Sequence, residues 1–293
     1  MYELIRAGEN SYYMDCPSKV GFFVSGSDAY MIDSGSDESS ARKARQILEK
    51  NGWELRKIFL THSHADHIGG AAFLQSRTGC GVFMAGTERE FCVNTLMELC
   101  VLFGSAPPKM TRNKFFMAPP SDTRLLTADE LPDGLETISL PGHSPSMTGY
   151  RTRDGVIFLA DLLSSASTLE KYGLGYTYDI AQHLSSLQAA ESLEAKCFVS
   201  SHAETLEDAG ELIELNRRSV LTVAERILSF TAEASSFEEI LKRTFEAYSL
   251  KMDLGQYMLI GSTVKAYLSY LTDLGEIVPE VDSGMLKWVR KRS

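Results

Sequence analysis

The chain has 293 residues, 44% of them hydrophobic, with 29 lysines and arginines against 39 aspartates and glutamates and a formal net charge of −10. This length and apolar content can bury a substantial core, in one large domain or two. The negative charge repels phosphate backbones at long range, which argues against nucleic acid as a partner, and no apolar stretch is long enough to span a membrane.

The start of the chain and its cysteines both favour the inside of a cell. Residues 1–6 lack the basic start and apolar run of a signal peptide. The cysteines are odd in number and form no C-x-x-C pair, which favours free thiols in a reducing cytoplasm, with a redox or nucleophilic cysteine as the alternative. They are Cys16, Cys80, Cys92, Cys100 and Cys197. We therefore expect a cytoplasmic protein.

In the first half of the chain, short strands alternate with helices. A strand-like stretch leads into Met31-Ile32-Asp33-Ser34-Gly35, and residues 37–51 have a helical composition with Gly52 as a plausible stop. The apolar run 57–61 predicts a short strand, and residues 68–77 predict another helix.

Further along, the apolar stretches at 140–144, 157–161 and 197–202 predict strands, and residues 179–195 predict a helix. The pattern changes after His202. We therefore expect two domains: an αβ unit over 1–206 and a helical region over 207–293.

The helical region divides into three predicted helices, 206–231, 236–248 and 255–274, and a capping signal at Ser235 to Glu239 precedes the second. Residues 276–288 predict two short strands around an Asp-Ser-Gly turn.

The most informative stretch is His62-Ser63-His64-Ala65-Asp66-His67, which places three imidazoles and one carboxylate directly after a predicted strand. Because a strand end fixes the first loop residues, His62 and His64 can face one side while Asp66 and His67 aim elsewhere. This spacing suits two metals better than one. The alternative is that the histidines cluster by accident or serve as polar groups near a core.

Three more residues of ligand type follow the later apolar stretches. His143, Asp161 and His202 each lie at or just past the end of a predicted strand, where functional sites are built. Of the 6 histidines, only His183 lies outside this pattern.

Taken together, these residues resemble the motifs of the metallo-β-lactamase superfamily. The H-x-H-x-D-H motif is matched at 62–67, and the later His, Asp and His of the family are matched by His143, Asp161 and His202. The family's N-terminal aspartate motif is matched around Asp33. The resemblance covers about residues 10–205 and is specific as a set.

The resemblance implies an α+β fold, a four-layer αβ/βα sandwich with two metals at one edge of two packed sheets. It assigns His62, His64 and His143 to one metal, Asp66, His67 and His202 to the other, and Asp161 to both. Nitrogen and oxygen ligands suit zinc and tolerate iron or manganese. Asp66 would orient the nucleophile and pass its proton to the leaving group, and Asp33 would pair with a ligating histidine.

Two positions distinguish this chain within the family. Several true β-lactamases carry a cysteine where Asp161 stands, whereas the aspartate is typical of glyoxalase II-like thioesterases, lactonases and the ribonuclease Z group, so an antibiotic-hydrolysing role is not expected. Many relatives also have glycines beside the last histidine, where this chain has Ser201 and Ala203.

Two regions are candidates for substrate contacts. Residues 104–120 are rich in proline, aromatics and methionine, as a semi-rigid apolar flap over a pocket would be, or as a cover on the sheet or on a partner subunit would be. Between Asp161 and His202 lie four residues that could donate a hydrogen bond near the site, and ordinary surface or capping roles are the alternative. They are Tyr172, Tyr176, Tyr178 and His183, of which we select His183 and Tyr178 as substrate-binding candidates.

The C-terminal helices and hairpin resemble the small winged-helix appendage of some hydrolases in this superfamily. A helix that reads DNA needs several basic or amide side chains, yet residues 260–274 contain Lys265 as their only basic residue. We therefore expect this helix to pack, line a pocket or form a dimer. The basic residues of 287–292 indicate a solvated end more than a binding arm.

Four functions follow from these patterns. The leading hypothesis is a zinc-dependent dinuclear hydrolase acting on a small carbonyl substrate, a thioester or related ester. The second is a metal-dependent phosphodiesterase, which should gather cations near the site, where Arg112, Lys114 and Lys171 are the candidates. An iron-dependent sulfur dioxygenase and a non-enzymatic binding module are the third and fourth. Whether the chain forms a homodimer stays open.

Overall fold

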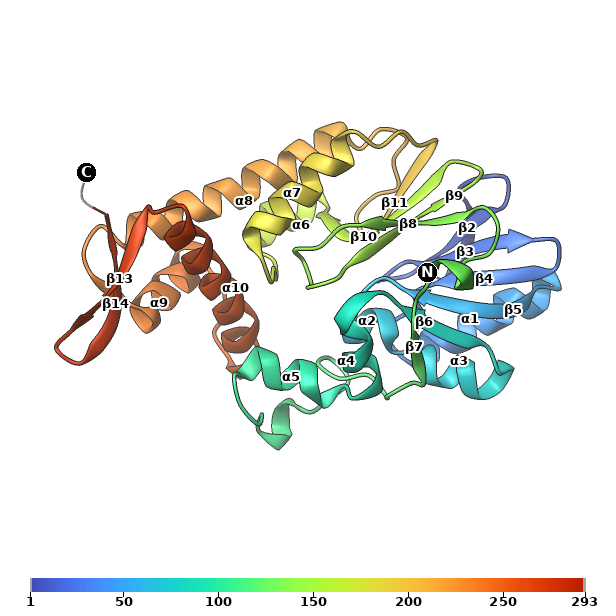
Figure 1. Ribbon diagram of the computed structural model, residues 1–293, viewed down its shortest axis with the longest axis horizontal. Coiled ribbons are helices and arrows are strands. Elements are labelled where there is room, and N and C mark those ends of the chain that lie inside the picture. Colours follow the sequence, from blue (N-terminus) through green and yellow to red (C-terminus); the bar gives the residue numbers. More distant parts are fainter. Residues whose placement is uncertain (1, 292–293) are drawn as a thin grey trace.

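Two β-sheets form the centre of the molecule, a computed structural model described here for residues 2–291 (Figure 1). The larger sheet has the order β1 (Glu3–Arg6), β2 (Ser11–Asp15), β3 (Val20–Ser25), β4 (Asp28–Ile32), β5 (Glu54–Leu60), β6 (Gly81–Met84), β7 (Thr123–Leu125). Its strands are antiparallel from β1 to β4 and parallel from β4 to β7. The smaller sheet has the order β11 (Cys197–His202), β10 (Val156–Ser164), β9 (Thr148–Thr152), β8 (Leu135–Ser139).

The two sheets face each other across an aromatic core. Phe59 of the larger sheet lies with its ring centroid 5.9 Å from that of Tyr150 in the smaller sheet, and both side chains are fully buried. Phe23 and Phe83 from the first sheet and Phe158 from the second belong to the same cluster. Burial of these large side chains holds the sheets together and so fixes the edge at which their loops meet.

Helices cover the outer face of each sheet. α1 (Glu38–Asn51) and α3 (Ala71–Thr78) share a buried cluster with the larger sheet, and α7 (Ile180–Glu191) and α8 (Gly210–Phe230) share one with the smaller sheet (Figure 1). The order is helix, sheet, sheet, helix. The predicted four-layer αβ/βα sandwich is therefore confirmed.

Local sequence signals fix some helix ends and miss others. Asp37 accepts hydrogen bonds from the backbone of Ser39 and Ser40 at the start of α1, and Gly52 ends that helix with φ 67°, as predicted. The predicted helix over 68–77 is confirmed from Ala71 onward, but its start is wrong, because the chain forms α2 (Ala65–Ile68), breaks at Gly69-Gly70, and then forms α3. A Cβ at Gly69 would lie 2.2 Å from the Ser36 carbonyl oxygen, so only glycine lets this turn approach the 34–36 backbone.

Other predicted bounds also need correction. α7 ends at Glu191 instead of 195, and α8 begins at Gly210 instead of 206. The stretch 140–144 is a loop after β8, since it turns sharply and Leu140 is its only fully buried apolar side chain. Short helices complete the first part of the chain: α4 (Arg89–Val93), α5 (Leu96–Phe103), α6 (Ala166–Tyr172), and the 3-10 turns η1 (Gly86–Glu88), η2 (Lys109–Thr111) and η3 (Ala128–Glu130).

The C-terminal region follows the predicted order of helices and a hairpin. After α8 come β12 (Ser235–Ser236), α9 (Phe237–Ala247), α10 (Leu254–Asp273), β13 (Ile277–Asp282) and β14 (Met285–Arg290), with the strand order β12-β14-β13. Ser236 and Glu239 form the expected capping box. The predicted boundary at 206/207 falls just before α8, whose first turns pack on the smaller sheet and whose later turns pack on α9 and α10.

α10, which would be the recognition helix of a DNA-binding winged helix, packs against other helices of the protein. It contacts α5, α7 and α8 (Figure 1). Its buried face includes Met258, Ile260, Val264 and Tyr267. This arrangement agrees with the expected packing role. Of the basic C-terminal residues, Lys287 and Arg290 lie in β14, whereas Arg292 lies outside the described residues.

All five cysteines are unpaired, as expected. Among residues 2–291, no helix is long and apolar enough to cross a membrane.

Candidate metal centre

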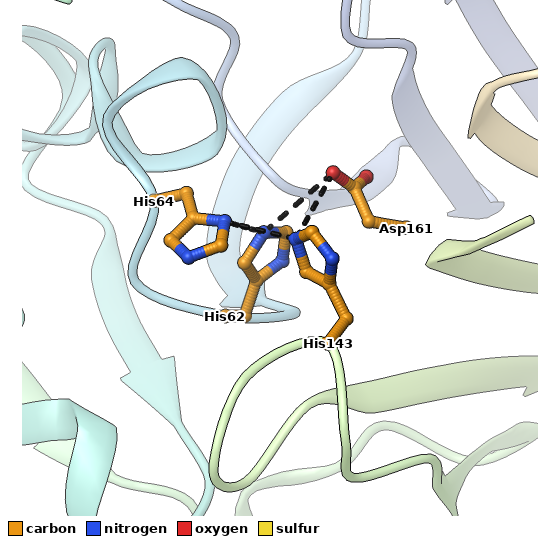
Figure 2. Close-up of side chains that lie close together, drawn as sticks. All are labelled: His62, His64, His143 and Asp161. Atoms are coloured by element: carbon orange, nitrogen blue, oxygen red, sulfur yellow. Dashed lines mark hydrogen bonds and ion pairs between the residues drawn. The ribbon is translucent and has the colours of Figure 1, made fainter. Parts of the chain in front are cut away.

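Four predicted ligands converge at one end of the two sheets (Figure 2). His62 and His64 follow β5, His143 lies in the loop after β8, and Asp161 lies on β10. The Nδ1 atom of His64 is 2.9 Å from Nε2 of His62 and 3.0 Å from Nε2 of His143. The Oδ2 atom of Asp161 lies 3.5 Å from Nε2 of His143. Three nitrogens and one oxygen thus point at a common centre.

A second group of predicted ligands lies beside the first. Nε2 of His202, at the end of β11, is 3.2 Å from Oδ2 of Asp66, and Nε2 of His67 is 3.6 Å from the same oxygen. Asp161 reaches both histidines, with Oδ2 3.2 Å from His202 Nε2 and Oδ1 3.1 Å from His67 Nε2. The carboxylate of Asp161 therefore stands between the two groups.

From the sequence we expected Asp161 at the end of a strand, and this expectation is wrong. Asp161 is inside β10, next to an irregularity at which the register with β11 shifts on both sides of Ala160. Ala160 has φ +52°, a backbone conformation that non-glycine residues adopt rarely. The bulge turns Asp161 toward the histidines while the flanking residues Leu159 and Leu162 stay in the core.

The donor set fits metal ions on two counts. Nε2 of His67 and Oδ1 of Asp161 are buried and make no hydrogen bond, although they lie 3.1 Å apart. A cation between them would satisfy both. Burial also lowers the pKa of His64 to about 4 and of His143 to about 3, so both rings are neutral at pH 7 and offer a lone pair.

Around the second group the carboxylates favour positive charge. Asp161 raises the pKa of His202 to about 10, and despite burial the neighbouring Asp161 and Asp66 hold the pKa of His67 well above its ordinary value. In a protein without metal, protons on His67 and His202 supply this positive charge. A metal ion would supply the same positive charge in their place.

Asp33 orients one histidine of each group, His67 directly and His62 through the hydroxyl of Thr61. Its Oδ2 accepts hydrogen bonds from Nδ1 of His67 at 2.8 Å and from the hydroxyl of Thr61 at 2.9 Å. Because the Thr61 hydroxyl donates to Asp33, it accepts from Nδ1 of His62, 2.9 Å away. Both imidazoles are thereby held with Nε2 toward the centre. Asp33 itself has φ +63°.

The sequence comparison agrees with this geometry. The family model described as Metallo-beta-lactamase superfamily matches residues 13–202. The chain belongs to the metallo-beta-lactamase superfamily. All the ligand-type residues of the two groups lie within the matched range.

Relatives in the superfamily match mainly over this part. The probable metallo-hydrolase YqgX of Bacillus subtilis is 29% identical over 159 residues, which are 53% of this chain and 68% of that protein. A hydroxyacylglutathione hydrolase of Xanthomonas axonopodis pv. citri is 29% identical over 177 residues, which are 59% of this chain and 57% of that enzyme. The family and the histidine–aspartate cluster together support a metal-dependent hydrolase.

Likeness of fold extends further along the chain. The solved structure of a beta-lactamase domain protein from Burkholderia ambifaria covers 99% of this chain and 94% of its own, with a TM-score of 0.72 and 18% sequence identity. The match therefore includes the C-terminal helices and hairpin. At 18% sequence identity it shows a shared fold and nothing about function.

Glu88, which the sequence did not single out, joins the two loops that carry the first group. It is 1% exposed, and its Oε1 accepts from the backbone nitrogen and the hydroxyl of Ser63 at 3.1 and 3.0 Å. Its Oε2 accepts from the hydroxyl of Ser144 at 2.9 Å and the backbone nitrogen of Ser146 at 2.6 Å. Glu88 precedes Arg89 and Glu90, a charged run that suggests a surface, so the sequence held no signal for this role.

Glu98 was missed as well. It lies on α5 with Oε1 3.5 Å from Nε2 of His64, and burial holds the pKa of its carboxyl well above its ordinary value. A single glutamate in the otherwise apolar Leu96–Phe103 is a signal that the sequence did carry.

A cavity of about 350 Å³, here called the outer cavity, opens beside His64 and Asp66. Lys114, Phe115 and Phe116 of the predicted flap line it, together with Leu102 of α5 and Leu259 of α10. Part of the 104–120 segment thus lies beside a cavity, and its role as a substrate loop stays a prediction. Phe115 remains 68% exposed.

A second cavity of about 210 Å³, the inner chamber, adjoins His143, Asp161 and His202. Helices α6, α7, α8 and α10 contribute to its wall. Tyr176 lines both cavities, with its ring centroid 5.2 Å from that of His64.

The substrate-binding candidates differ in position. His183 lines the inner chamber and is 6% exposed. Tyr178 is 44% exposed and lines neither cavity, and its backbone nitrogen bonds to the carbonyl oxygen of Gly142. Tyr172 is exposed as well. The side chain of Tyr176, which was not selected from the sequence, therefore lies beside His64 and His143 in place of Tyr178.

Proposed function

We propose that the protein is a dinuclear metal-dependent hydrolase that cleaves a small thioester or related ester. The observation that carries the proposal is the pair of donor groups that share Asp161. His62, His64 and His143 would hold one ion, Asp66, His67 and His202 the other, and Asp161 both. Nitrogen and carboxylate donors favour zinc, and iron or manganese suits the same set.

When bound, two such ions make a hydroxide available at neutral pH and polarise the carbonyl oxygen. The chain contributes orientation and proton transfer. Oδ2 of Asp66 is held by the hydroxyl of Ser18 at 2.6 Å, and the Asp66 side chain is 42% exposed on the side of the outer cavity. From there it can orient the attacking oxygen. As that oxygen bonds to the carbonyl carbon and the C–S bond breaks, Asp66 passes the proton to the departing sulfur.

The charges around the cavities favour a carbonyl substrate over a phosphodiester. Among the three candidate cations, only Lys114 lines a cavity. Arg112 donates to the carbonyl oxygen of Pro107, and Lys171 lies over the ring of Tyr172. A diesterase would need more positive charge to bind its substrate. The hydroxyacylglutathione hydrolases among the relatives point to thioesters as well.

The same proposal includes a small-molecule partner and a cytoplasmic location, which the five unpaired thiols favour. The inward-facing α10 argues against nucleic acid. A homodimer is compatible with the exposed apolar residues of α5 and the flap, Met97, Val101 and Met110, and light scattering of the purified protein decides it.

The decisive experiment compares hydrolysis of a glutathione thioester and of an aryl phosphodiester by zinc-loaded protein, with the number of bound ions measured by elemental analysis. His64→Ala is the blank, and Glu90→Gln, a surface change, is the matched control. We expect two ions per chain and a thioester rate at least about 100-fold above the diester rate. A faster diester rate would support the phosphodiesterase, and unchanged turnover in His64→Ala would refute the metal mechanism.

A further inference from the structure

Three histidines of the metal centre have a hydrogen-bond partner on the ring nitrogen that faces away from the centre. The partners are a hydroxyl, a carboxylate and a backbone carbonyl, each 2.8 or 2.9 Å from Nδ1 of the ring. The pairs are His62 with Thr61, His67 with Asp33, and His202 with Pro17. Such a bond fixes the tautomer of the ring and the direction in which its other nitrogen points.

His64 is oriented the other way round. Its Nδ1 faces the centre, 2.9 Å from Nε2 of His62 and 3.0 Å from Nε2 of His143, so its own Nε2 points away. A neutral imidazole that offers a lone pair at Nδ1 carries its proton at Nε2. Oε1 of Glu98 lies 3.5 Å from this nitrogen, and among residues 2–291 no other carboxylate oxygen is within 4.0 Å of it.

The carboxyl group of Glu98 is available for this role. Within the described part of the chain, its only ion pair is the one to His64. The separation of 3.5 Å exceeds a normal N–H···O distance of about 2.7–3.2 Å. Both side chains border the outer cavity, at 20% and 13% exposure, so the carboxyl has room to close the remaining distance. A carboxyl oxygen accepts whether or not the group is protonated, so the bond does not depend on the charge of Glu98.

Glu98 comes from outside the loops that carry the ligands. It lies on α5, and Leu102, one turn later on the same helix, lines the outer cavity with it. α5 also contacts α10, which contributes Leu259 to that cavity. The other side-chain partners, Asp33 and Thr61, are 2% and 1% exposed and belong to the interior. Glu98 is thus the point at which the wall of the outer cavity meets the metal centre.

We propose that Glu98 is a positioning residue, which accepts a hydrogen bond from Nε2 of His64, keeps Nδ1 directed at the metal centre, and couples the wall of the outer cavity to it. The inference rests on the proposed function only in that an ion is held by His62, His64 and His143. Glu98 touches neither that ion nor the reacting atoms, and it acts through His64.

The first test observes the His64 ring by NMR in zinc-loaded protein with isotope-labelled histidine. The spectra distinguish a metal-bound ring nitrogen from one that carries a proton, and the signal missing in His64→Ala assigns this residue. We expect a proton on Nε2 in the wild type, and Glu98→Leu should speed its exchange with water at least about tenfold. Glu98→Gln should stay within about threefold of the wild type, because the amide oxygen still accepts while the nitrogen faces the cavity. Met97→Gln, an exposed change on the same helix, is the matched control.

The second test measures the coupling to the cavity wall. Zinc should slow amide hydrogen exchange in α5 at least about fivefold in the wild type and less than about twofold in Glu98→Leu, with α9 as the internal reference. Because coupling between two sites is reciprocal, Glu98→Leu should also weaken zinc binding, by about tenfold in competition with a chelator.

Three outcomes would overturn the inference: zinc bound at Nε2 of His64, unchanged exchange of the ring proton in Glu98→Leu, or full protection of α5 by zinc in that variant. None of these measurements involves turnover. If the expected signals appear but no ester is hydrolysed, the proposed function alone is refuted. Thioester hydrolysis together with an unchanged ring proton in Glu98→Leu would refute the role of Glu98 alone.

Discussion

The Oε2 atom of Glu88 accepts a hydrogen bond from the backbone nitrogen of Ser146 at 2.6 Å, across 58 positions of the chain. With the bonds from Ser63 and Ser144, it joins the loop after β5 to the loop after β8. All four donors are N–H or O–H groups, so both oxygens of residue 88 must accept. The distance between His64 and His143 thus depends on a residue that touches neither.

Replacing Glu88 by glutamine should weaken metal binding. The amide can accept on one side only, so the bonds to one of the two loops are lost. We expect Glu88→Gln to lower the affinity of the ion at His62, His64 and His143 by roughly 10- to 100-fold. Competition with a chromophoric chelator measures this, and the exposed Glu90→Gln should bind as the wild type does. Equal affinity in both variants would contradict the prediction.

Asp33→Asn should affect both ions, because Asp33 orients one histidine in each group. Oδ2 of Asp33 accepts both of these bonds, and Oδ1 accepts from the backbone nitrogen of Thr61 at 2.8 Å. The amide nitrogen of an asparagine must therefore face a donor at one of the two positions, and both imidazoles lose part of their held orientation. We expect both metal affinities to fall by roughly 10- to 100-fold. Thr61→Val removes only the link to His62, so it should weaken one ion and spare the other. Cobalt spectra of the two variants would separate these cases, and identical spectra would show that the direct bond from Asp33 to His67 does not contribute.

Gly70→Ala should destabilise the fold without touching a ligand. A Cβ there would lie 2.3 Å from the Ser34 carbonyl oxygen and 2.8 Å from Cβ of Ala41, so backbone must move. We expect a loss of roughly 3 kcal/mol in the free energy of unfolding, measured in urea. Gly210→Ala meets only Asp208 Oδ1, at 3.2 Å, and should change stability by less than about 0.5 kcal/mol. Similar midpoints for the two variants would show that the break between α2 and α3 tolerates a side chain.

His183 should make stability depend on pH. Burial lowers its pKa from 6.5 to about 4, so between these values the unfolded chain binds a proton that the folded chain does not. Stability due to this residue is therefore lost as the pH falls from 6.5 toward 4, by about 2 kcal/mol at pH 5. In metal-free protein, His183→Gln should lose about that much less than the wild type between pH 7 and pH 5. Parallel losses would show that the ring is protonated in the fold.

Strand ends and the spacing of 62–67 are local signals, and from them the sequence predicted strands, helices and a metal site. The two packed sheets and the meeting of seven ligand-type residues were implied by the resemblance to the superfamily. The sequence did not predict the bulge at Ala160 that turns Asp161 inward, since a bulge depends on how β10 pairs with β11. The break at Gly69-Gly70 was missed for a similar reason, because its cause is the backbone of 34–36.

The residues around the ligands were harder to foresee. Asp33 was found through its motif, but Glu88 stands in a charged run that is typical of a surface and becomes buried only when two distant loops close over it. Tyr176 and Tyr178 are two positions apart and equally plausible in the sequence. Their different exposure follows from the docking of α7 on Gly142, a contact that no local pattern announces.

Because α10 packs inward, the metal-ligand residues and part of the cavity walls come from two distant stretches of the chain. Every ligand-type residue of the metal centre lies before position 203, whereas Leu259 and Tyr267, one in the wall of each cavity, come from the last fifth of the chain. Substitutions in α10 can therefore change which molecules are admitted while the reactive groups stay as they are. Substitutions in this one helix can therefore change the substrate during evolution, while every intermediate variant keeps the residues of the metal centre.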